Sequence, residues 1–575
     1  MKFKRYYLPL FAISLTLTSC GFGFYRATYN TTSLETKKVS AYSLFDIDAD
    51  TTYQLSDKMT KEKVTLKYEE GKEYIPYITI EDYLSLLPFK KDFKYEVNET
   101  VSGQSVVVGK KDSIDGTISQ YYYAAYFYPS SKQVNYRGGF MSAMTTYDEK
   151  AELTEGLNDH DRVVKGKENF ITSSYRNFSF PAYLNNDEVY YPLMFLNTVF
   201  SDDSGINVIY DMDKLYVFEK YKDASNFKYL ENEEECRIYT ATEKYAKEHN
   251  QTVMPEYLRI FNRDILLFTM ENYYGLKSTR SIKSMITYYK DNGLYDKFID
   301  EDASVRNLAI SEAINKLNDD HTGIIANFFR PVWGDLVTTE RGDISKARNQ
   351  AEKTLTDSRA AVYENSGLTL KDIRYSNDGK VAVIVFDTFM EESIPELVAN
   401  LNKVAAKGGV EKVVLDISTN GGGYLANLYK ALAIISEDPI YSIHLCIDYV
   451  NTVYELYGEY DTNKDGRYDK EDCYGDNFQF YLLTSKCSFS CGNALPCAAK
   501  TDGLAKIIGE TSGGGECAVG THLLGNGFYF QHSSINHLGA FKNNKFEGFE
   551  SGATPDIELP YSDFYDVEKI ADAIK

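Results

Sequence analysis

The sequence is poor in tryptophan, with one residue among 575, and it lacks an excess of basic side chains. Lysine and arginine number 62 against 84 aspartates and glutamates, and the formal net charge is −22. Proteins that bind nucleic acid or anionic lipid surfaces need clusters of basic side chains, and none stands out here. The composition therefore argues against a nucleic-acid partner and against electrostatic docking to a membrane.

Paired cysteine motifs are also missing. Beyond Cys20 no cysteines have the paired CxxC spacing of a zinc module, which disfavours a zinc site of that kind. Seven cysteines remain without Cys20, and an odd number gives no complete disulfide framework. They are Cys236, Cys446, Cys473, Cys487, Cys491, Cys497 and Cys517.

No apolar run reaches the roughly 18 residues that a membrane-spanning helix needs. The short run Leu8 to Leu17 follows Lys2, Lys4 and Arg5, which is the layout of a cleaved secretory signal. The remainder of the chain is therefore expected to lie outside the membrane.

The signal ends in Leu17-Thr18-Ser19-Cys20, which resembles the bacterial lipobox. The resemblance implies cleavage before Cys20 and lipidation of that cysteine, so the chain would be an extracytoplasmic, lipid-anchored protein of the bacterial cell envelope. Several acyl chains on one residue hold a protein stably on a membrane. An ordinary cleaved signal with a chance cysteine is the alternative.

The mature chain divides by composition and periodicity into an α+β accessory region and a larger α/β unit with a helical N-terminal part. Residues 376–520 alternate strand and helix, which predicts a parallel sheet joined by right-handed crossovers. The expected segments are a signal at 1–20, a tether at 21–60, an accessory α+β domain at 61–231, a helical part at 232–330, a linker and helix at 331–375, and an α/β core at 376–575 with an insertion at 445–477.

Two loops of the α/β core follow buried strands. Asp416 to Gly423 runs from a strand end into three glycines, which allow close backbone approach and expose N–H groups. Alone this is a tight turn or a phosphate loop, but the phosphate loop's lysine and hydroxyl residue are missing. In Leu482 to Pro496, Ser490 stands at a strand-to-helix turn, where it is either a helix N-cap or a nucleophile beside the N–H of Cys491.

A serine hydroxyl needs a base, and histidine has a suitable pKa. His321, in Asp320-His321-Thr322 after a predicted helix, is the candidate. A lone histidine is otherwise most often structural.

In chain order these pieces are His321-Thr322, Asp416 to Gly423, FSCGNALP with Ser490, Gly509-Glu510, and Gly552 to Asp556. Their order resembles the superfamily of tail-specific and tricorn-core serine peptidases over about residues 232–575. The resemblance implies a crotonase-like α/β peptidase core, a peptide or protein substrate, and no cofactor for catalysis.

The superfamily offers two kinds of base. The tail-specific branch uses a lysine in a GxxTxGKG segment, but Gly509 to Glu516 contains none. A lysine base from Lys486 or Lys500 nevertheless stays open. The tricorn-like branch uses a histidine and a carboxylate near the terminal GxxPD.

The tricorn-like pattern implies that His321 is the base and Ser490 the nucleophile. Glu550 would be the orienting carboxylate, with Glu547 as the second candidate. The oxyanion would be held by the N–H of Cys491 and one N–H of the glycine loop, from Gly421 or Gly422.

The insertion carries a separate motif. Asp461 to Asp472 follows the twelve-residue calcium-loop template, with glycine at the sixth position and aspartate rather than glutamate at the twelfth. A solvated acidic turn is the alternative, and bound calcium would be structural. The expected ligands are Asp461, Asn463, Asp465, the backbone carbonyl of Arg467, Asp469 and Asp472.

Three functions remain open at this point. The first is a serine endopeptidase. The second is a catalytically inactive surface binding protein on a peptidase fold. The third, an acyl-CoA enzyme of crotonase type, fits the expected fold but not export from the cell, because coenzyme A is scarce there.

Overall fold

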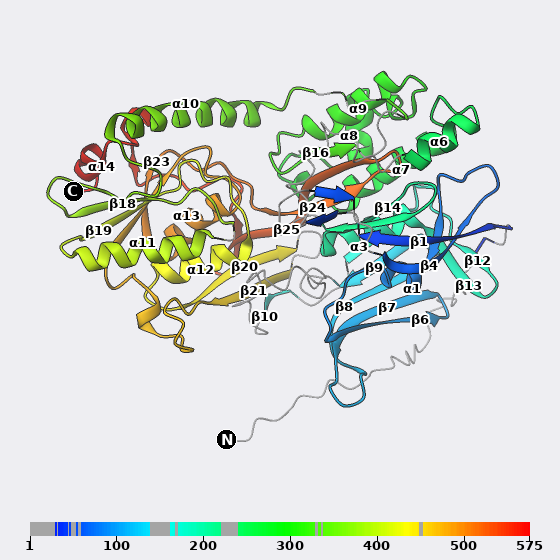
Figure 1. Cartoon of the computed structure of the whole chain (residues 1–575), viewed down its shortest axis with the longest axis horizontal. Helices are drawn as coiled ribbons and strands as arrows, with labels where there is room; N and C mark the ends of the chain where they lie inside the picture. The colour runs from blue at the N-terminus through cyan, green and yellow to red at the C-terminus, as the bar shows by residue number, and fades with distance from the viewer. Residues whose placement is uncertain are drawn as a thin grey trace.

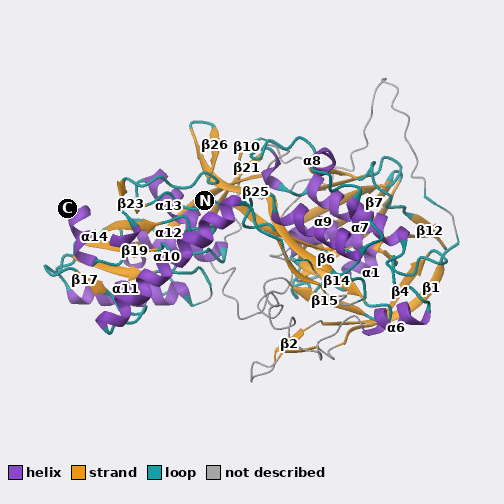
Figure 2. Ribbon diagram, turned by 90° about the horizontal axis from the view of Figure 1, so that it is seen from above, coloured by secondary structure: helices purple, strands orange, loops and turns teal. Residues whose placement is uncertain are grey.

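The computed structural model describes residues 29–30, 33–43, 45–47, 53–55, 59–137, 162–166, 171–219, 240–327, 332–334, 337, 339–390, 392–447 and 452–575. The signal, Cys20 and Cys236 lie outside this range. Two lobes sit side by side, with strand β25 (Phe528–Lys542) between them (Figure 1, Figure 2). No helix in the described part of the chain is both long and apolar enough to cross a membrane.

The C-terminal lobe contains a six-stranded sheet in the order β17-β18-β19-β22-β23-β27. All neighbours in it are parallel except β17 and β18. Its strands are β17 (Arg374–Tyr375), β18 (Val381–Val385), β19 (Lys412–Asp416), β22 (Gln479–Thr484), β23 (Ala505–Gly509) and β27 (Ile557–Glu558). The near-continuous apolar character of β18 arises because helices cover both faces.

Alternate side chains of β18 enter different cores. Ala382 and Ile384 belong to the large core, and Val381 and Val383 belong to a smaller core on the opposite face. One face is covered by α11 (Ser393–Lys407), α12 (Leu425–Ile435) and α13 (Cys491–Asp502), and the other by α10 (Asp343–Ser366) and α14 (Val567–Ala573) (Figure 1). The sheet is therefore a central layer, and its strand ends open onto loops.

A second, antiparallel sheet joins the lobes, and the sequence analysis did not predict it. Its order is β10-β21-β20-β25-β16, with β24 and β26 also paired to β25. At one end β25 pairs with β16, where Gly323 faces Gln531, and at the other it pairs with β20 and β26. The strands are β10 (Arg162–Lys165), β16 (Gly323–Asn327), β20 (Ile440–Ile447), β21 (Thr452–Glu459), β24 (Cys517–Leu523) and β26 (Lys545–Gly548).

Among the described residues, the N-terminal lobe contains a seven-stranded and a five-stranded sheet together with the helices α1 (Ile80–Leu84) and α3 (Leu193–Ser204). The seven-stranded sheet runs β12 (Tyr183–Asn185), β13 (Glu188–Pro192), β5 (Tyr77–Thr79), β4 (Met59–Tyr68), β1 (Glu35–Ser43), β15 (Leu215–Glu219) and β14 (Ile206–Tyr210). The five-stranded sheet runs β11 (Ile171–Ser174), β9 (Gln133–Arg137), β8 (Ile118–Tyr128), β7 (Gly103–Lys111) and β6 (Phe93–Thr100). A short pair, β2 (Phe45–Ile47) and β3 (Tyr53–Leu55), stands apart.

The expected tether at 21–60 is wrong where β1 lies. Residues Glu35–Ser43 form an interior strand between β4 and β15. Val39 and Ala41 are buried at alternate positions, as a strand requires. The polar composition of the segment conceals this short alternation.

Helices α6 (Thr240–Glu248), α7 (Glu256–Asn272), α8 (Met285–Asp291) and α9 (Ala303–Asn315) follow, with short 3₁₀ turns at Gly275–Lys277 (η1) and Lys297–Ile299 (η2). Their apolar faces and the accessory sheets share one hydrophobic core with the C-terminal lobe. A buried hydrogen bond from Ser201 Oγ on α3 to the Thr521 carbonyl on β24, at 2.9 Å, joins the accessory region to the connecting sheet. The accessory region therefore packs directly against the rest of the molecule and is not a separate domain on a linker.

Candidate active site

Ser490 lies on a strained turn between β22 and α13. Its backbone has φ 57° and ψ −125°, a region that residues other than glycine rarely occupy. Such strain persists only where the surroundings enforce it, and it concentrates at functional sites. A sharp strand-to-helix turn of this kind is how a nucleophilic serine is lifted out of a sheet.

The glycine loop at 421–423 enforces the Ser490 turn by close backbone packing. A Cβ added at Gly422 would lie 2.7 Å from Ser490 Cβ, and one added at Gly492 would lie 2.3 Å from the Asn420 carbonyl oxygen. That same carbonyl accepts a 2.9 Å hydrogen bond from the N–H of Phe489. Only glycine fits at these two points, so the two loops fix each other.

Of the two serines in this turn, Ser490 is the one left for chemistry. Ser488 is fully buried, donates to the Ile417 carbonyl at 2.7 Å and accepts from the Ser485 N–H at 3.0 Å. Within the described residues the Ser490 hydroxyl makes no hydrogen bond, and its side chain is partly exposed. The turn thus presents Ser490 to the outside.

Two of the three expected oxyanion donors are available. The N–H groups of Gly421 and Cys491 donate to no other residue in the described ranges, and Cys491 opens helix α13, where the helix dipole favours negative charge. The N–H of Gly422 instead donates to Asn420 Oδ1 at 2.9 Å. The prediction for Gly422 is wrong in this structure, because its N–H is already used and its role is to leave room for Ser490.

His321 lies in the loop between α9 and β16 and is buried, with 6% of its surface exposed. Its backbone N–H donates to Asp319 Oδ1 at 3.0 Å. Its ring packs against the ring of Phe489, the neighbour of Ser490, with 4.7 Å between centroids. The fold thus brings the loops of the candidate base and nucleophile together. No hydrogen bond joins His321 to Ser490 among the described residues.

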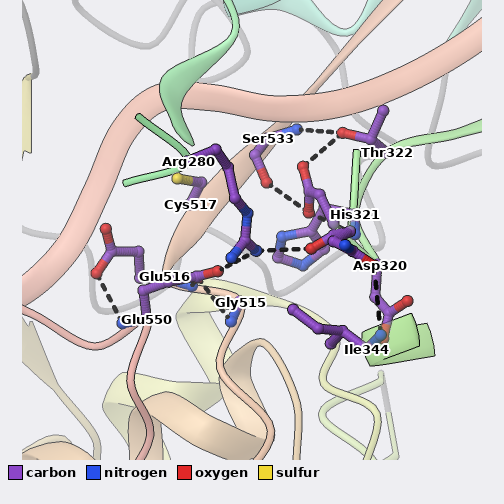
Figure 3. Close-up of polar contacts among 12 residues, drawn as sticks. Arg280, Asp320, His321, Thr322, Ile344, Gly515, Glu516, Cys517, Ser533 and Glu550 are labelled. Carbon is purple, nitrogen blue, oxygen red and sulfur yellow. Dashed lines mark hydrogen bonds and ion pairs between the residues drawn. The ribbon is translucent and has the colours of Figure 1, made fainter. Parts of the chain in front are cut away.

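Glu550 is the buried member of the two candidate carboxylates. Arg280 Nη2 lies 3.0 Å from its Oε1, and the N–H groups of Gly515 and Glu516 donate to its Oε2 at 3.1 and 3.2 Å (Figure 3). Burial, followed by repulsion from Asp319, raises the pKa of Glu550 above its usual value. In the part of the chain that is described, it has no hydrogen bond to His321.

Glu547 does not fit the role of reserve candidate. It lies on β26 with an exposed side chain and pairs with Lys545 at 2.9 Å. It therefore belongs to the outer edge of the hairpin and not to the site.

Both lysines that could replace the histidine are paired elsewhere. Lys486 Nζ lies 3.2 Å from Glu510, and Lys500 Nζ lies 2.8 Å from Asp556. Both ammonium groups are thus engaged by carboxylates in the described structure.

Arg348 is a member of the site that sequence reasoning missed. From α10, its Nη1 lies 3.1 Å from Asp320 Oδ2, and its guanidinium carbon lies 4.4 Å from the centre of the Phe489 ring. Asp320 precedes His321 and also accepts a hydrogen bond from Ser345. Arg348 therefore connects the two loops, and no motif around this single arginine could have revealed it.

A cavity of about 480 Å³ opens beside these loops. Its walls carry carboxylates, one arginine and the ring of Phe489, the residue before Ser490, so charged groups and an aromatic ring line it together. The lining residues are Thr279, Arg280, Asn318, Asp319, Asp320, Ile344, Phe489, Gly513, Glu516, Gly548, Glu550 and Ser551.

The predicted calcium loop forms a tight turn in which side-chain carboxylates accept hydrogen bonds from backbone N–H groups. Asp461 Oδ2 accepts from the N–H of Gly466 at 2.7 Å, and Asp472 accepts from the N–H groups of Thr462 and Asp469 at 2.8 and 3.0 Å. Gly466 has φ 82°, as the template's sharp turn requires. Across the described chain, the only group of three close metal-ligating side chains lies elsewhere, at Glu516, Cys517 and His537.

Comparison with known proteins identifies the C-terminal part of the chain. Residues 380–559, which contain the glycine loop, Ser490 and Glu550, match the family model of Peptidase family S41. This segment, about a third of the chain, is similar to the serine peptidases of family S41. The match agrees with the tail-specific and tricorn-like serine peptidase superfamily that the motifs indicated. No curated protein matches the sequence.

Solved structures similar to the chain include three peptidases of this group. For the photosystem II D1 C-terminal processing protease, identity is 18%, with 33% of this chain and 46% of that chain covered and a TM-score of 0.27. For mature CPAF, identity is 12%, with 56% of this chain and 97% of that chain covered and a TM-score of 0.36. For the tricorn protease, identity is 11%, with 92% of this chain and 59% of that chain covered and a TM-score of 0.30. The chain thus spans about half the length of the D1 processing protease.

Proposed function

We propose that this chain is an extracytoplasmic serine endopeptidase with Ser490 as nucleophile, His321 as base and Glu550 as the orienting carboxylate. The observation that carries the proposal is the strained backbone of Ser490, which the glycine loop holds at the start of α13. Strain of this kind is costly, of the order of 1–3 kcal/mol, and a helix N-cap does not need it. The fold we propose for the domain is crotonase-like.

In the proposed mechanism the imidazole of His321 takes the proton of Ser490 as Oγ attacks the peptide carbonyl carbon. The resulting oxyanion accepts hydrogen bonds from the N–H groups of Cys491 and Gly421. One such donor lowers the barrier by roughly 3–4 kcal/mol. The imidazolium then protonates the leaving amine, and water hydrolyses the acyl-enzyme by the same route. Glu550 stabilises the imidazolium.

The mechanism requires a hydrogen bond between the His321 ring and the Ser490 hydroxyl. Hydrogen bonds of catalytic groups are often long without substrate and tighten in the complex. Arg280 also holds Glu550 in the present arrangement, so that contact must loosen as well.

The absent His321–Ser490 hydrogen bond favours a second candidate, an inactive peptidase fold that binds a peptide without cutting it. One experiment separates the two. Purified protein is treated with a fluorophosphonate probe and, separately, with a casein substrate. We expect labelling and hydrolysis in the native chain, loss of both in Ser490→Ala, and retention of both in the control Ser562→Ala. A folded native chain that neither labels nor hydrolyses would leave the binding function.

We also propose that Cys20 carries the lipid anchor, on the strength of the lipobox-like sequence alone. A bacterial host fed an alkyne fatty acid should label the native chain and not the Cys20→Ala variant. Equal labelling of both proteins would sink this assignment.

The loop at 461–472 is proposed to bind one structural calcium ion beside the connecting sheet. Gly466 and the acidic pattern support this. The ligands would be Asp461, Asn463, Asp465, the Arg467 carbonyl, Asp469 and Asp472.

A further inference from the structure

A buried cysteine, histidine and glutamate meet where β24 begins. Cys517 on β24 and His537 on β25 are directly paired across the two strands, and Glu516 precedes Cys517. The residues Cys517, His537 and Glu516 are 3%, 7% and 5% exposed. Their ligand atoms all lie within 4.8 Å of one another.

The three side chains converge, as metal ligands do, and are not arranged as a catalytic relay. The Nδ1 atom of His537 lies 2.6 Å from Glu516 Oε1 and 3.7 Å from Cys517 Sγ. The other ring nitrogen of His537, Nε2, lies 4.0 Å from Cys517 Sγ. In a cysteine-based catalytic relay the acid and the thiol would sit on opposite nitrogens of the ring. Here both are nearest to Nδ1.

We infer that Glu516, Cys517 and His537 form a binding site for a thiophilic divalent cation, with Zn²⁺ as the best-suited ion. Thiolate, imidazole and carboxylate are the ligands that zinc prefers. Tetrahedral zinc with ordinary bond lengths separates a sulfur and a nitrogen ligand by roughly 3.6 Å, close to the 3.7 Å between Cys517 Sγ and His537 Nδ1. Tetrahedral zinc separates a nitrogen and an oxygen ligand by roughly 3.4 Å, so Glu516 Oε1, now 2.6 Å from Nδ1, must turn away from the ring by roughly 0.8 Å.

The surroundings suit a cation. The cavity beside the site is lined by Asp319, Glu516 and Glu550 together with Arg280 as the neighbouring cation, so a 2+ ion offsets an excess of carboxylate (Figure 3). Glu516 reaches the cavity wall, which gives an ion an entry path. Its other oxygen, Oε2, accepts from the N–H of Glu550 at 2.8 Å. A hydrogen bond of this kind, from the backbone to a metal-binding carboxylate, orients the ligand.

A cation bound at Glu516, Cys517 and His537 would affect the proposed active site through Glu516. The N–H of Glu516 donates to Glu550 Oε2, and Glu516 Oε2 accepts from the N–H of Glu550. A cation that turns the Glu516 carboxylate therefore shifts the segment that holds Glu550. The cysteine spacing could not reveal this site, because its ligands come from two strands and only one of them is a cysteine.

The test is Co²⁺ binding to the native, tag-free, reduced full chain after chelator treatment. We expect one equivalent of Co²⁺ to give a thiolate-to-cobalt absorption band and tetrahedral ligand-field bands, both displaced by Zn²⁺. Cys517→Ser should abolish the thiolate band, and His537→Gln should weaken Co²⁺ binding at least tenfold. Cys446→Ser, which removes a half-buried thiol from the same sheet, should change neither.

The outcomes decide the proposal independently of peptidase activity. A native chain that shows no thiolate band, or a band that survives in folded Cys517→Ser, overturns it. If Cys517→Ser does not fold, the native-chain spectrum and His537→Gln decide it. Cobalt held only by the oxygen ligands of the 461–472 loop gives no thiolate band and counts against the site.

Discussion

The two loops that carry the candidate nucleophile and base are built in different ways. The Ser490 turn is held by backbone packing within one lobe, where Gly422 and Gly492 admit no side chain. The His321 loop is held by side chains between elements: Asp319 beneath it, the Asp320–Arg348 pair, and the Phe489 ring. The nucleophile half is therefore preformed and rigid, whereas the base half depends on contacts that can rearrange.

The strongest test of this contrast is Gly422→Ala. The new methyl group would lie 2.7 Å from Ser490 Cβ, at a backbone φ of 104°. We expect peptidase activity to fall by about 10²–10³ because the turn must shift, and the free energy of unfolding to drop by about 1–3 kcal/mol from overpacking. Hydrolysis rates and urea denaturation measure the two effects.

Gly421→Ala is the matched control. Nothing lies within 4 Å of a Cβ at this position, and alanine keeps the N–H that the proposed oxyanion hole uses. Activity within a fewfold of the native value is expected. Equal damage from both substitutions would show that the loop as a whole, and not its contact with Ser490, is sensitive.

Arg348→Met probes the base half. Loss of the guanidinium removes the ion pair between Asp320 and α10 and leaves the hydrogen bond from Ser345. The His321 loop should therefore stay folded but be positioned less accurately. We expect kcat to fall roughly 10- to 100-fold, as for an interaction that orients a catalytic group, with KM nearly unchanged. Arg348→Lys should restore part of the rate, and Lys346→Met on the same helix should have no effect.

A purely structural role for Arg348 predicts a different pattern. Activity would then fall only in proportion to the folded fraction, and the pH profile of kcat would be unchanged. A shifted pH profile, measured in folded protein, distinguishes positioning of His321 from simple destabilisation.

Glu550 provides a smaller, pH-dependent test. Burial and Asp319 hold its pKa above the usual value, so the native state keeps a proton that the unfolded chain has released. Between the unfolded pKa of about 4.3 and the folded one, the free energy of unfolding falls as pH rises. Glu550→Gln should flatten this decline in urea titrations at several pH values, whereas Glu547→Gln on the exposed hairpin should leave it intact.

The smallest effect is expected at the 461–472 loop. Asp461→Asn removes one ligand charge and should weaken calcium uptake in calorimetry at least tenfold. The melting temperature with calcium should drop by a few degrees, since ligand binding stabilises by mass action. If the native chain takes up no calcium, the loop is an acidic turn and nothing more.

The sequence predicted the parts of the fold that depend on local signals. Strands β22 and β23 lie in the region where the sequence predicted alternating strand and helix, because both are buried on two faces and bounded by turn residues. The glycine loop and the Ser490 turn were found for the same reason. Sequence distance concealed the pairing of β24 with β25 and the contact of Arg348 with Asp320. Strand β1 was missed because the alternation of its two buried residues, Val39 and Ala41, is too short to predict a strand.

Strand β16, directly after His321, pairs in the described chain with β25, where Gly323 faces Gln531. A ribosome or secretion channel releases residue 531 long after residue 323. The loop of the base thus gains its strand partner only when nearly the whole polypeptide is present. A chain that ends before β25 would lack this strand partner, so the proposed base would have no fixed place in it.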